Sequence, residues 1–190
     1  MKVSREKAEQ NRELVVETAG KLFREHGFDG IGVADLMKSA GLTVGGFYKN
    51  FDSKEDLLAE SCKRISDSTL EKWKGYAADP SIPDPFKRIG TSYLSSKNRD
   101  DLAKTCIYST LAGEAPRHED AVKRVFSDGT QSIIDFLATI VAGETEEERR
   151  AKAIITFSQW VGALMLSRAA GQSELSDEIL KAARIATNVE

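Results

Sequence analysis

The chain has 190 residues and a formal net charge of -3, and this length suits one globular domain or two small ones that share a core. Apolar residues make up 41% and charged residues 30% of it, a balance that excludes a disordered or fibrous protein. The acidic balance also excludes a polybasic protein that binds nucleic acid without sequence preference. The two cysteines, Cys62 and Cys106, give no disulfide framework and favour a reducing compartment.

The sequence shows no signal for export or membrane insertion. Its N-terminal residues are charged throughout and lack the apolar core of a signal peptide. No segment approaches the ~18 consecutive apolar residues that a membrane span needs. We therefore expect a cytoplasmic protein with no membrane partner.

The first apolar pattern predicts a long helix over residues 4–25. Val15, Ala19 and Leu22 recur at helical spacing and form one stripe. Gly27 supplies the stop, because glycine tolerates the left-handed backbone conformation that closes a helix.

Two short helices and a second long helix are predicted next. The apolar repeat that starts at Val33 gives a helix of about two turns, which Gly41 ends. Thr43 is expected to cap a third short helix that reaches Asn50. Ser53 caps a fourth helix, whose first turn carries acidic residues that the helix dipole favours.

The rest of the chain is also predicted to be helical. Three of the four prolines lie in residues 79–85, so the fourth helix stops there, and Asp84 caps the next one. Thr145 with Glu148 forms a capping box for one later helix, and Ser176 caps the last. The predicted ranges are 85–97, 101–114, 119–141, 146–170 and 177–188. Strand signals are almost absent, so we expect an all-α fold of about nine helices.

Residues 31–58 carry the main functional signal. Two short helices joined by a tight turn form a helix-turn-helix, in which Gly41 allows the sharp corner and Leu42 fills the space between the helices. Such a unit presents its second helix to the DNA major groove, N-terminal residues first. The small residues Thr43–Gly46 let the backbone approach phosphates. No acidic residue occurs between positions 36 and 51, which keeps this surface compatible with DNA.

The pattern from Ala19 to Leu58, above all its stretch AGLTVGGFYKNFDSKEDLL, resembles the DNA-binding domain of the TetR family of bacterial transcriptional regulators. Beyond this pattern the chain matches the family only in length and helical pattern. The resemblance implies a helix-turn-helix DNA-binding domain, placed at 1–54, and an effector-binding and dimerisation domain at 55–190. It also implies a homodimer that binds a palindromic operator on double-stranded DNA.

The resemblance assigns DNA contacts to the second short helix and its flanks. Tyr48 matches an aromatic phosphate contact, Lys49 the groove-facing side, and Lys54 a lysine that clamps a phosphate. The expected DNA-binding residues are Thr43, Val44, Gly45, Gly46, Tyr48, Lys49, Asn50 and Lys54. Two positions depart from the family pattern. Residues 32–33 (Gly-Val) replace a frequent hydroxyl, so that phosphate contact falls to a backbone amide or is missing, and an asparagine replaces the frequent histidine after Lys49.

The distribution of charge reconciles an acidic protein with DNA binding. Residues 1–54 carry nine basic and eight acidic side chains, a net of +1, whereas residues 55–190 carry 18 and 22, a net of -4. Because salt screens charges beyond roughly 10 Å at 0.1 M, the cations close to the phosphates decide the local field. The candidates are Lys2, Arg5, Lys7, Lys38, Lys49 and Lys54. So few cations predict modest non-specific affinity and a shallow salt dependence.

The later helices are expected to hold an effector and a second subunit. Aromatic and aliphatic side chains with few polar anchors suit a small hydrophobic or aromatic molecule. The expected effector-binding residues are Phe86, Ile89, Tyr93, Cys106, Tyr108, Leu111, His118, Val122, Phe126 and Trp160. The expected dimer-interface residues are Ile154, Phe157, Val161, Leu164, Met165, Ile179, Leu180 and Ala183. For every one of them, ordinary packing inside the subunit is the competing interpretation.

The sequence disfavours a reactive thiol, a metal site and an enzyme. Cys106 lies in a segment similar to one in a TetR subgroup, some members of which respond to electrophiles, but no basic partner is visible, so a small core residue is favoured. No metal site or cofactor is expected, because His26 and His118 lack partners at ligand spacing. An enzyme is disfavoured, since GxSxG, HExxH and P-loop motifs are missing. A ligand-responsive repressor fits best; an activator, or a regulator without a small ligand, is the alternative.

Overall fold

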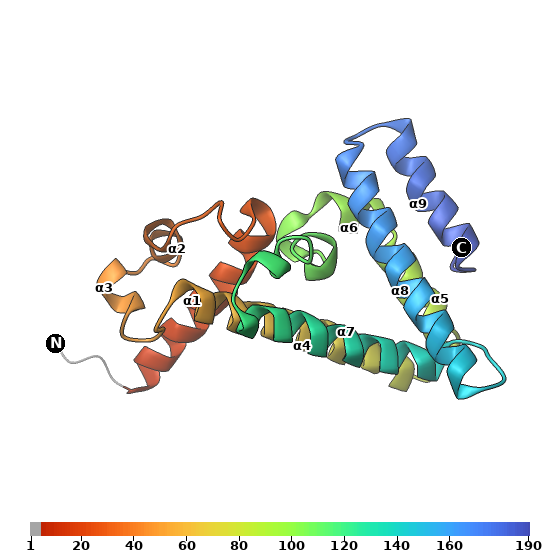
Figure 1. Cartoon of the computed structure of the whole chain (residues 1–190), viewed down its shortest axis with the longest axis horizontal. Coiled ribbons are helices and arrows are strands. Elements are labelled where there is room, and N and C mark those ends of the chain that lie inside the picture. Colours follow the sequence, from red (N-terminus) through yellow and green to blue (C-terminus); the bar gives the residue numbers. More distant parts are fainter. Residues whose placement is uncertain (1–4) are drawn as a thin grey trace.

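The computed structural model describes residues 5–190, so Lys2 and the predicted helix start at Ser4 lie outside the described residues (Figure 1). Over this range the chain forms nine α-helices and three short 3₁₀ helices, without a strand, and the predicted fold class is confirmed. The α-helices are α1 (Arg5–His26), α2 (Val33–Ser39), α3 (Val44–Phe47), α4 (Lys54–Ala78), α5 (Pro85–Tyr93), α6 (Ser96–Asp100), α7 (Asp120–Ile140), α8 (Glu146–Ala169) and α9 (Glu174–Ala186). The 3₁₀ helices are η1 (Leu102–Lys104), η2 (Ile107–Ser109) and η3 (Ala115–Arg117).

Helices α1, α2 and α3 form the head of the molecule, residues 5–53, at the left of Figure 1. Gly27 ends α1 with φ of 79°, and Gly41 makes the corner between α2 and α3 with φ of 68°, both as predicted. Leu42 is half-buried and packs against the core, and its amide donates to the Met37 carbonyl at 2.8 Å. The two turns therefore take the glycine-dependent form that the sequence predicts.

The body is built on one long pair of helices. Helix α4 leaves the head and lies along α7, and α8 packs across the far part of this pair with α9 beside it (Figure 1). No helix among residues 5–190 has the length and apolar character needed to cross a membrane.

Local capping signals position most of these helices. The Ser53 hydroxyl accepts a hydrogen bond from the Asp56 amide at 3.0 Å. The Asp84 carboxylate accepts one from the Lys87 amide of α5 at 2.8 Å. Thr145 and its capping-box partner start α8 as predicted. The predicted cap at Ser176 is wrong, because Ser173 caps α9 three residues earlier. Ser176 is instead buried and donates its hydroxyl to the Ser167 carbonyl at 2.6 Å.

The predicted helix over 101–114 is also wrong, since η1, η2 and irregular turns occupy that segment. The guanidinium of Arg168 on α8 donates to the carbonyl of Arg99 at 2.9 Å and of Ser109 at 3.2 Å, and also to the Thr105 hydroxyl. Arg24 on α1 donates to the Thr105 carbonyl at 3.1 Å. The two arginines donate to backbone carbonyls that would be paired within the segment if it were helical. They therefore stabilise the non-helical conformation of residues 99–109.

The predicted helix over 85–97 is interrupted as well. Helix α5 ends at Tyr93, and Ser95 caps the separate short helix α6 by accepting from the Asn98 amide at 3.2 Å. The break separates α5 from α6, and residues of α4, α5 and α6 line a common cleft.

Candidate nucleic-acid interface and effector cleft

The short helix α3 exposes polar and small residues above a buried aromatic base. Tyr48 is 67% exposed and Val44 is 44% exposed, whereas Phe47 is fully buried. The rings of Phe47 and Phe51 lie 5.5 Å apart, and the Tyr48 ring meets Phe47 edge-on at 5.1 Å. The two phenylalanines therefore anchor α3 to the head, and the Tyr48 side chain points to solvent.

The two glycines of α3 have different surroundings. A Cβ atom on Gly45 would meet no heavy atom within 4 Å, whereas a Cβ atom on Gly46 would lie 3.6 Å from Met37 Cε. Gly45 therefore faces open space, and Gly46 faces the head core. Thr43 occupies the N-cap position in an extended conformation, but its hydroxyl makes no cap hydrogen bond.

Two of the predicted DNA-binding residues have partners within the head. The Asn50 amide nitrogen donates to the Gly46 carbonyl at 2.8 Å, which leaves its side-chain oxygen for another donor. Lys54 Nζ, at the start of α4, lies 5.9 Å from the centroid of the Phe23 ring. Residues 43–50 thus form one continuous segment at the α3 surface, and Lys54 stands at the N-terminus of the next helix.

Ion pairs fix α4 against α1. Arg12 contacts both carboxylate oxygens of Glu60, at 2.6 and 2.5 Å, and Arg64 contacts Glu13 at 2.5 Å. The hydrogen bond that Arg12 donates to Glu60 raises the pKa of Arg12 above its usual value. Both cations therefore hold α1 against α4, and neither belongs to the predicted DNA-binding residues.

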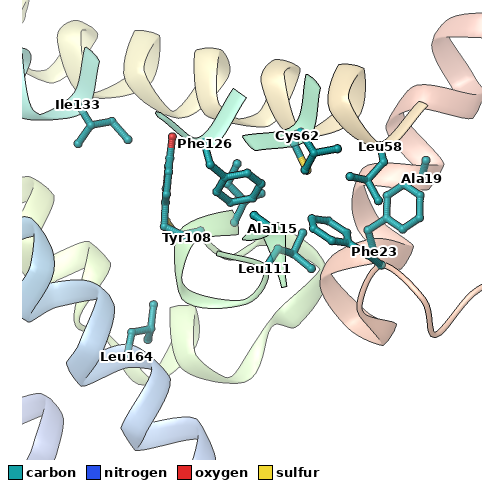
Figure 2. Close-up of a cluster of buried hydrophobic side chains, with 14 of the residues drawn as sticks. Ala19, Phe23, Leu58, Cys62, Tyr108, Leu111, Ala115, Phe126, Ile133 and Leu164 are labelled. Carbon is teal, nitrogen blue, oxygen red and sulfur yellow. The ribbon is translucent and has the colours of Figure 1, made fainter. Parts of the chain in front are cut away.

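A buried aromatic contact joins the head to the body. The Phe28 ring packs edge-on against His118 at 4.8 Å and against Phe126 at 6.3 Å. The Phe28 amide donates to the Glu114 carboxylate at 2.8 Å. Figure 2 shows the same apolar cluster running from the head side chains Ala19 and Phe23 to the body residues Tyr108 and Ile133. The head and the body therefore share one continuous apolar core.

A second junction contact lies beside the first. His118 Nδ1 is 2.7 Å from a Glu55 carboxylate oxygen, and the Glu119 amide donates to the other oxygen at 3.3 Å. Glu55 belongs to the first turn of α4, directly after the proposed phosphate-binding Lys54. The loop before α7 is thereby tied to the start of α4.

The aromatic members of the ten predicted effector-binding residues include two clusters, which the Phe157 ring joins by meeting both Tyr93 and Tyr108. In the first, Trp160 stacks on Tyr93 at 5.6 Å and meets Phe86 at 5.5 Å. In the second, Tyr108 meets Phe126 at 5.5 Å, close to the junction with the head. The members that are buried in the subunit core are Ile89, Tyr93, Cys106, Tyr108, Leu111, Val122, Phe126 and Trp160. Most of these side chains pack against one another.

A cleft of about 440 Å³ opens beside the first cluster, and we call it the α4–α5 cleft. It is lined by Thr69, Lys72, Trp73, Tyr76, Arg88, Ile89, Ser92, Tyr93, Ser95, Lys97, Asn98, Asp101, Lys104, Thr105 and Cys106. Only Ile89, Tyr93 and Cys106 among the ten predicted residues border it. The sequence missed the basic residues of the cleft, because lysines and arginines on exposed helix faces carry no signal of what they surround.

Both thiols are buried. Burial raises the pKa of the Cys62 thiol to about 12 and also raises the pKa of the Cys106 thiol. Two neutral, buried thiols are typical of small core residues, the interpretation that the sequence favours for Cys106.

The predicted dimer residues divide according to burial. Phe157, Leu164, Leu180 and Ala183 are buried inside the subunit. The exposed or half-buried members are Ile154, Val161, Met165 and Ile179. Four further apolar side chains, missed by the sequence analysis, are exposed on the same helices: Ile155 at 65%, Leu166 at 59%, Leu175 at 57% and Ile185 at 51%. Helix α8 is apolar on two sides, so its periodicity alone does not show which side is buried.

Comparisons with known proteins agree with this architecture. Residues 15–61 match the family model described as "Bacterial regulatory proteins, tetR family". The chain is 27% identical to the HTH-type transcriptional repressor DhaR of Mycobacterium sp. (strain GP1), a match that covers 89% of this chain and 88% of DhaR. It is 26% identical to the uncharacterized HTH-type transcriptional regulator YerO of Bacillus subtilis (strain 168), over 49% of this chain but only 34% of YerO.

Solved structures share the whole fold. A TetR transcriptional regulator from Legionella pneumophila superposes with a TM-score of 0.81 at 17% identity, covering 93% of this chain and 94% of that one. The reduced form of Escherichia coli NemR superposes with a TM-score of 0.76 at 19% identity, covering 93% and 96%. At these identities the likeness describes the fold.

Proposed function

Because the chain belongs to the TetR family of bacterial regulatory proteins, we propose that it is a ligand-responsive transcriptional repressor that binds a palindromic operator as a homodimer. The observation that carries the proposal is the α3 surface: open space at Gly45, an exposed Tyr48, and no acidic side chain between positions 36 and 51. One relative, DhaR, is itself named a transcriptional repressor.

In this proposal α3 enters the major groove with its N-terminus leading. Thr43, Val44 and Gly45 meet base edges and phosphates, and the Asn50 side-chain oxygen accepts from a base amine. Tyr48 donates to a phosphate through its exposed hydroxyl. Lys49, Lys54 and the amides at the α3 N-terminus supply positive charge. One head reads only a few base pairs, so two heads spaced by one DNA turn, ~34 Å, supply useful affinity.

Removing a phosphate contact is expected to weaken binding to every DNA sequence. Tyr48→Ala and Lys54→Ala should each raise the Kd for operator and non-operator DNA alike, and Lys54→Ala should also lower the salt slope by about one per subunit. Affinity measured across a series of salt concentrations tests this. Lys63→Ala is the matched control, because Lys63 pairs with Asp67 at 2.6 Å on the exposed side of α4. An unchanged slope in Lys54→Ala would refute the phosphate role of that lysine.

The outward apolar face of α8 and α9 is the proposed dimer interface. Its residues are Ile154, Ile155, Val161, Met165, Leu166, Ile179 and Ile185. Gly162 lies on α8 among them, and a Cβ atom there would meet no heavy atom within 4 Å, so a partner helix can approach closely. The buried members of the predicted set would support this face from below.

A charge on that face is expected to separate the subunits. Ile155→Glu combined with Leu166→Glu places two carboxylates in an apolar contact and should give a monomer at micromolar concentration. Sedimentation equilibrium measures the mass. Leu102→Glu is the control, since Leu102 is 37% exposed on η1, away from both helices. A dimer that persists in the double variant would contradict the proposed interface.

We place the small aromatic effector in the α4–α5 cleft. Thr105 borders this cleft and accepts a hydrogen bond from Arg24 of the head, so a shift of residues 101–106 reaches α1 directly. The Phe28–Glu114 contact provides a second route to the head. An effector can release the protein from DNA only if it binds the released state more tightly than the DNA-competent state. In this proposal the two states differ in the orientation of the head relative to the body.

Footprinting at a regulated promoter tests the direction of control. Protection of a palindrome that overlaps the promoter, and is lost on adding effector, is the expected result for a repressor. Protection upstream of the promoter would instead assign an activator of the same fold.

A further inference from the structure

The α4–α5 cleft holds more positive charge than the subunit neutralises. Lys72, Arg88, Lys97 and Lys104 all line it, and Asp101 is the one carboxylate among the described lining residues. Asp101 lies 3.5 Å from Lys104 Nζ, so its charge is shared with that lysine. The other three cations have no carboxylate of residues 5–190 within 4.0 Å. In a cleft, such an excess of positive charge attracts and concentrates anions.

Two of these cations lie close to one aromatic ring that lines the cleft. The Arg88 guanidinium lies 5.4 Å and the Lys72 ammonium 5.8 Å from the centroid of the Tyr76 ring. They come from different helices, α5 and α4, and converge on the same half-buried side chain. Two cations gathered at one ring attract a carboxylate, which accepts charge-assisted hydrogen bonds from ammonium and guanidinium groups.

The inner wall of the cleft is aromatic and contains one polar group without a partner. Trp73 and Tyr93 lie edge-on with ring centroids 6.1 Å apart, and Ile89 borders the same space. Tyr93 is 95% buried, and its hydroxyl has no hydrogen-bond partner of normal geometry in the described chain. The side chains of Cys106 and Ser109 lie next to this buried hydroxyl, so it marks a polar point in the otherwise aromatic inner wall.

We propose that the effector of this protein is a small aromatic carboxylate. Its carboxylate lies between Lys72 and Arg88, and its ring packs on the aromatic wall towards Tyr93. The inference rests on the proposed ligand-responsive function and specifies the ligand class of that site. A neutral aromatic ligand would strip water from the cations without pairing them, which costs free energy. The cleft volume of about 440 Å³ suits a molecule of this size.

Direct binding to the DNA-free chain tests the charge requirement. Calorimetric titration with benzoate, salicylate, cinnamate and indole-3-acetate is compared with titration of the four corresponding amides. At least one acid is expected to bind, and to bind about 10-fold or more tightly than its amide, because only the acid pairs with the cations. Equal affinity for acid and amide, or no binding of any acid in the millimolar range, would overturn the proposal.

Variants locate the site. Lys72→Gln and Arg88→Gln should each weaken the tightest acid about 10-fold and leave its amide unchanged. Lys74→Gln is the matched control, because Lys74 stands two positions further along α4, pairs with Glu71 at 2.8 Å and does not line the cleft. Equal acid affinity in all three variants would place the anion elsewhere and overturn the proposal.

The two proposals fail separately. Operator binding is measured in the absence of any acid, so a chain that binds its operator but does not discriminate acid from amide retains the repressor proposal and loses this one. If the chain instead binds an acid through Lys72 and Arg88 but binds no specific DNA, the effector proposal stands and the repressor proposal fails.

Discussion

Replacing Gly45 with leucine is expected to abolish sequence-specific DNA binding without destabilising the protein. A Cβ atom at this position meets no heavy atom within 4 Å, so the larger side chain strains nothing inside the head. It projects from the surface that would face the groove, and it keeps the backbone of α3 away from bases and phosphates. Operator affinity should fall about 1,000-fold, towards the level of non-specific binding. Fluorescence anisotropy with labelled operator measures the loss.

Gly75→Leu is the matched control for this substitution. Gly75 lies on α4 in the body, and a Cβ atom there also meets no heavy atom within 4 Å. Both variants replace an exposed helical glycine with a better helix former, so both should keep or slightly raise thermal stability. Only the Gly45 variant should lose the operator. Wild-type operator affinity in Gly45→Leu would count against docking through α3.

Truncating Phe28 is expected to cause the largest loss of stability. Its ring is fully buried and meets Phe23, His118 and Phe126, so it touches both head and body. Phe28→Ala removes this contact and leaves a cavity, which costs about 3–5 kcal/mol. Urea unfolding followed by circular dichroism measures the difference in the free energy of unfolding.

Leu14→Ala is the comparison for Phe28→Ala. Leu14 is 43% exposed on α1, so its truncation should change the free energy of unfolding by no more than about 0.5 kcal/mol. If Phe28→Ala were destabilised no more than Leu14→Ala, the head and body would not be joined through this aromatic contact.

The sequence predicted the head well because its signals are local. Gly27 and Gly41 adopt left-handed conformations at the ends of α1 and α2, where the pattern requires a stop. Ser53 caps α4 with the predicted hydrogen bond. Each feature depends on residues a few positions apart, so it can be recognised without the rest of the fold.

The misplaced elements depend on contacts between distant parts of the chain. Arg168 and Arg24 hold residues 98–109 open from two different helices, and the local apolar pattern of 101–114 does not contain either. Ser176 resembles a cap in sequence, but tertiary packing buries it. The α4–α5 cleft also depends on contacts between distant parts of the chain, since α4, α5, α6 and the segment after α6 form it together. Its charge becomes visible only when these elements are brought together.

Selection of bound DNA from a random library by the purified 190-residue chain tests the central claim most directly. We predict enrichment of one palindrome whose half-sites lie about one DNA turn apart and whose complex contains two subunits. Gly45→Leu should give no enrichment under the same conditions. Recovery of unrelated sequences by the wild-type chain, or enrichment of a single half-site bound by one subunit, would contradict the account.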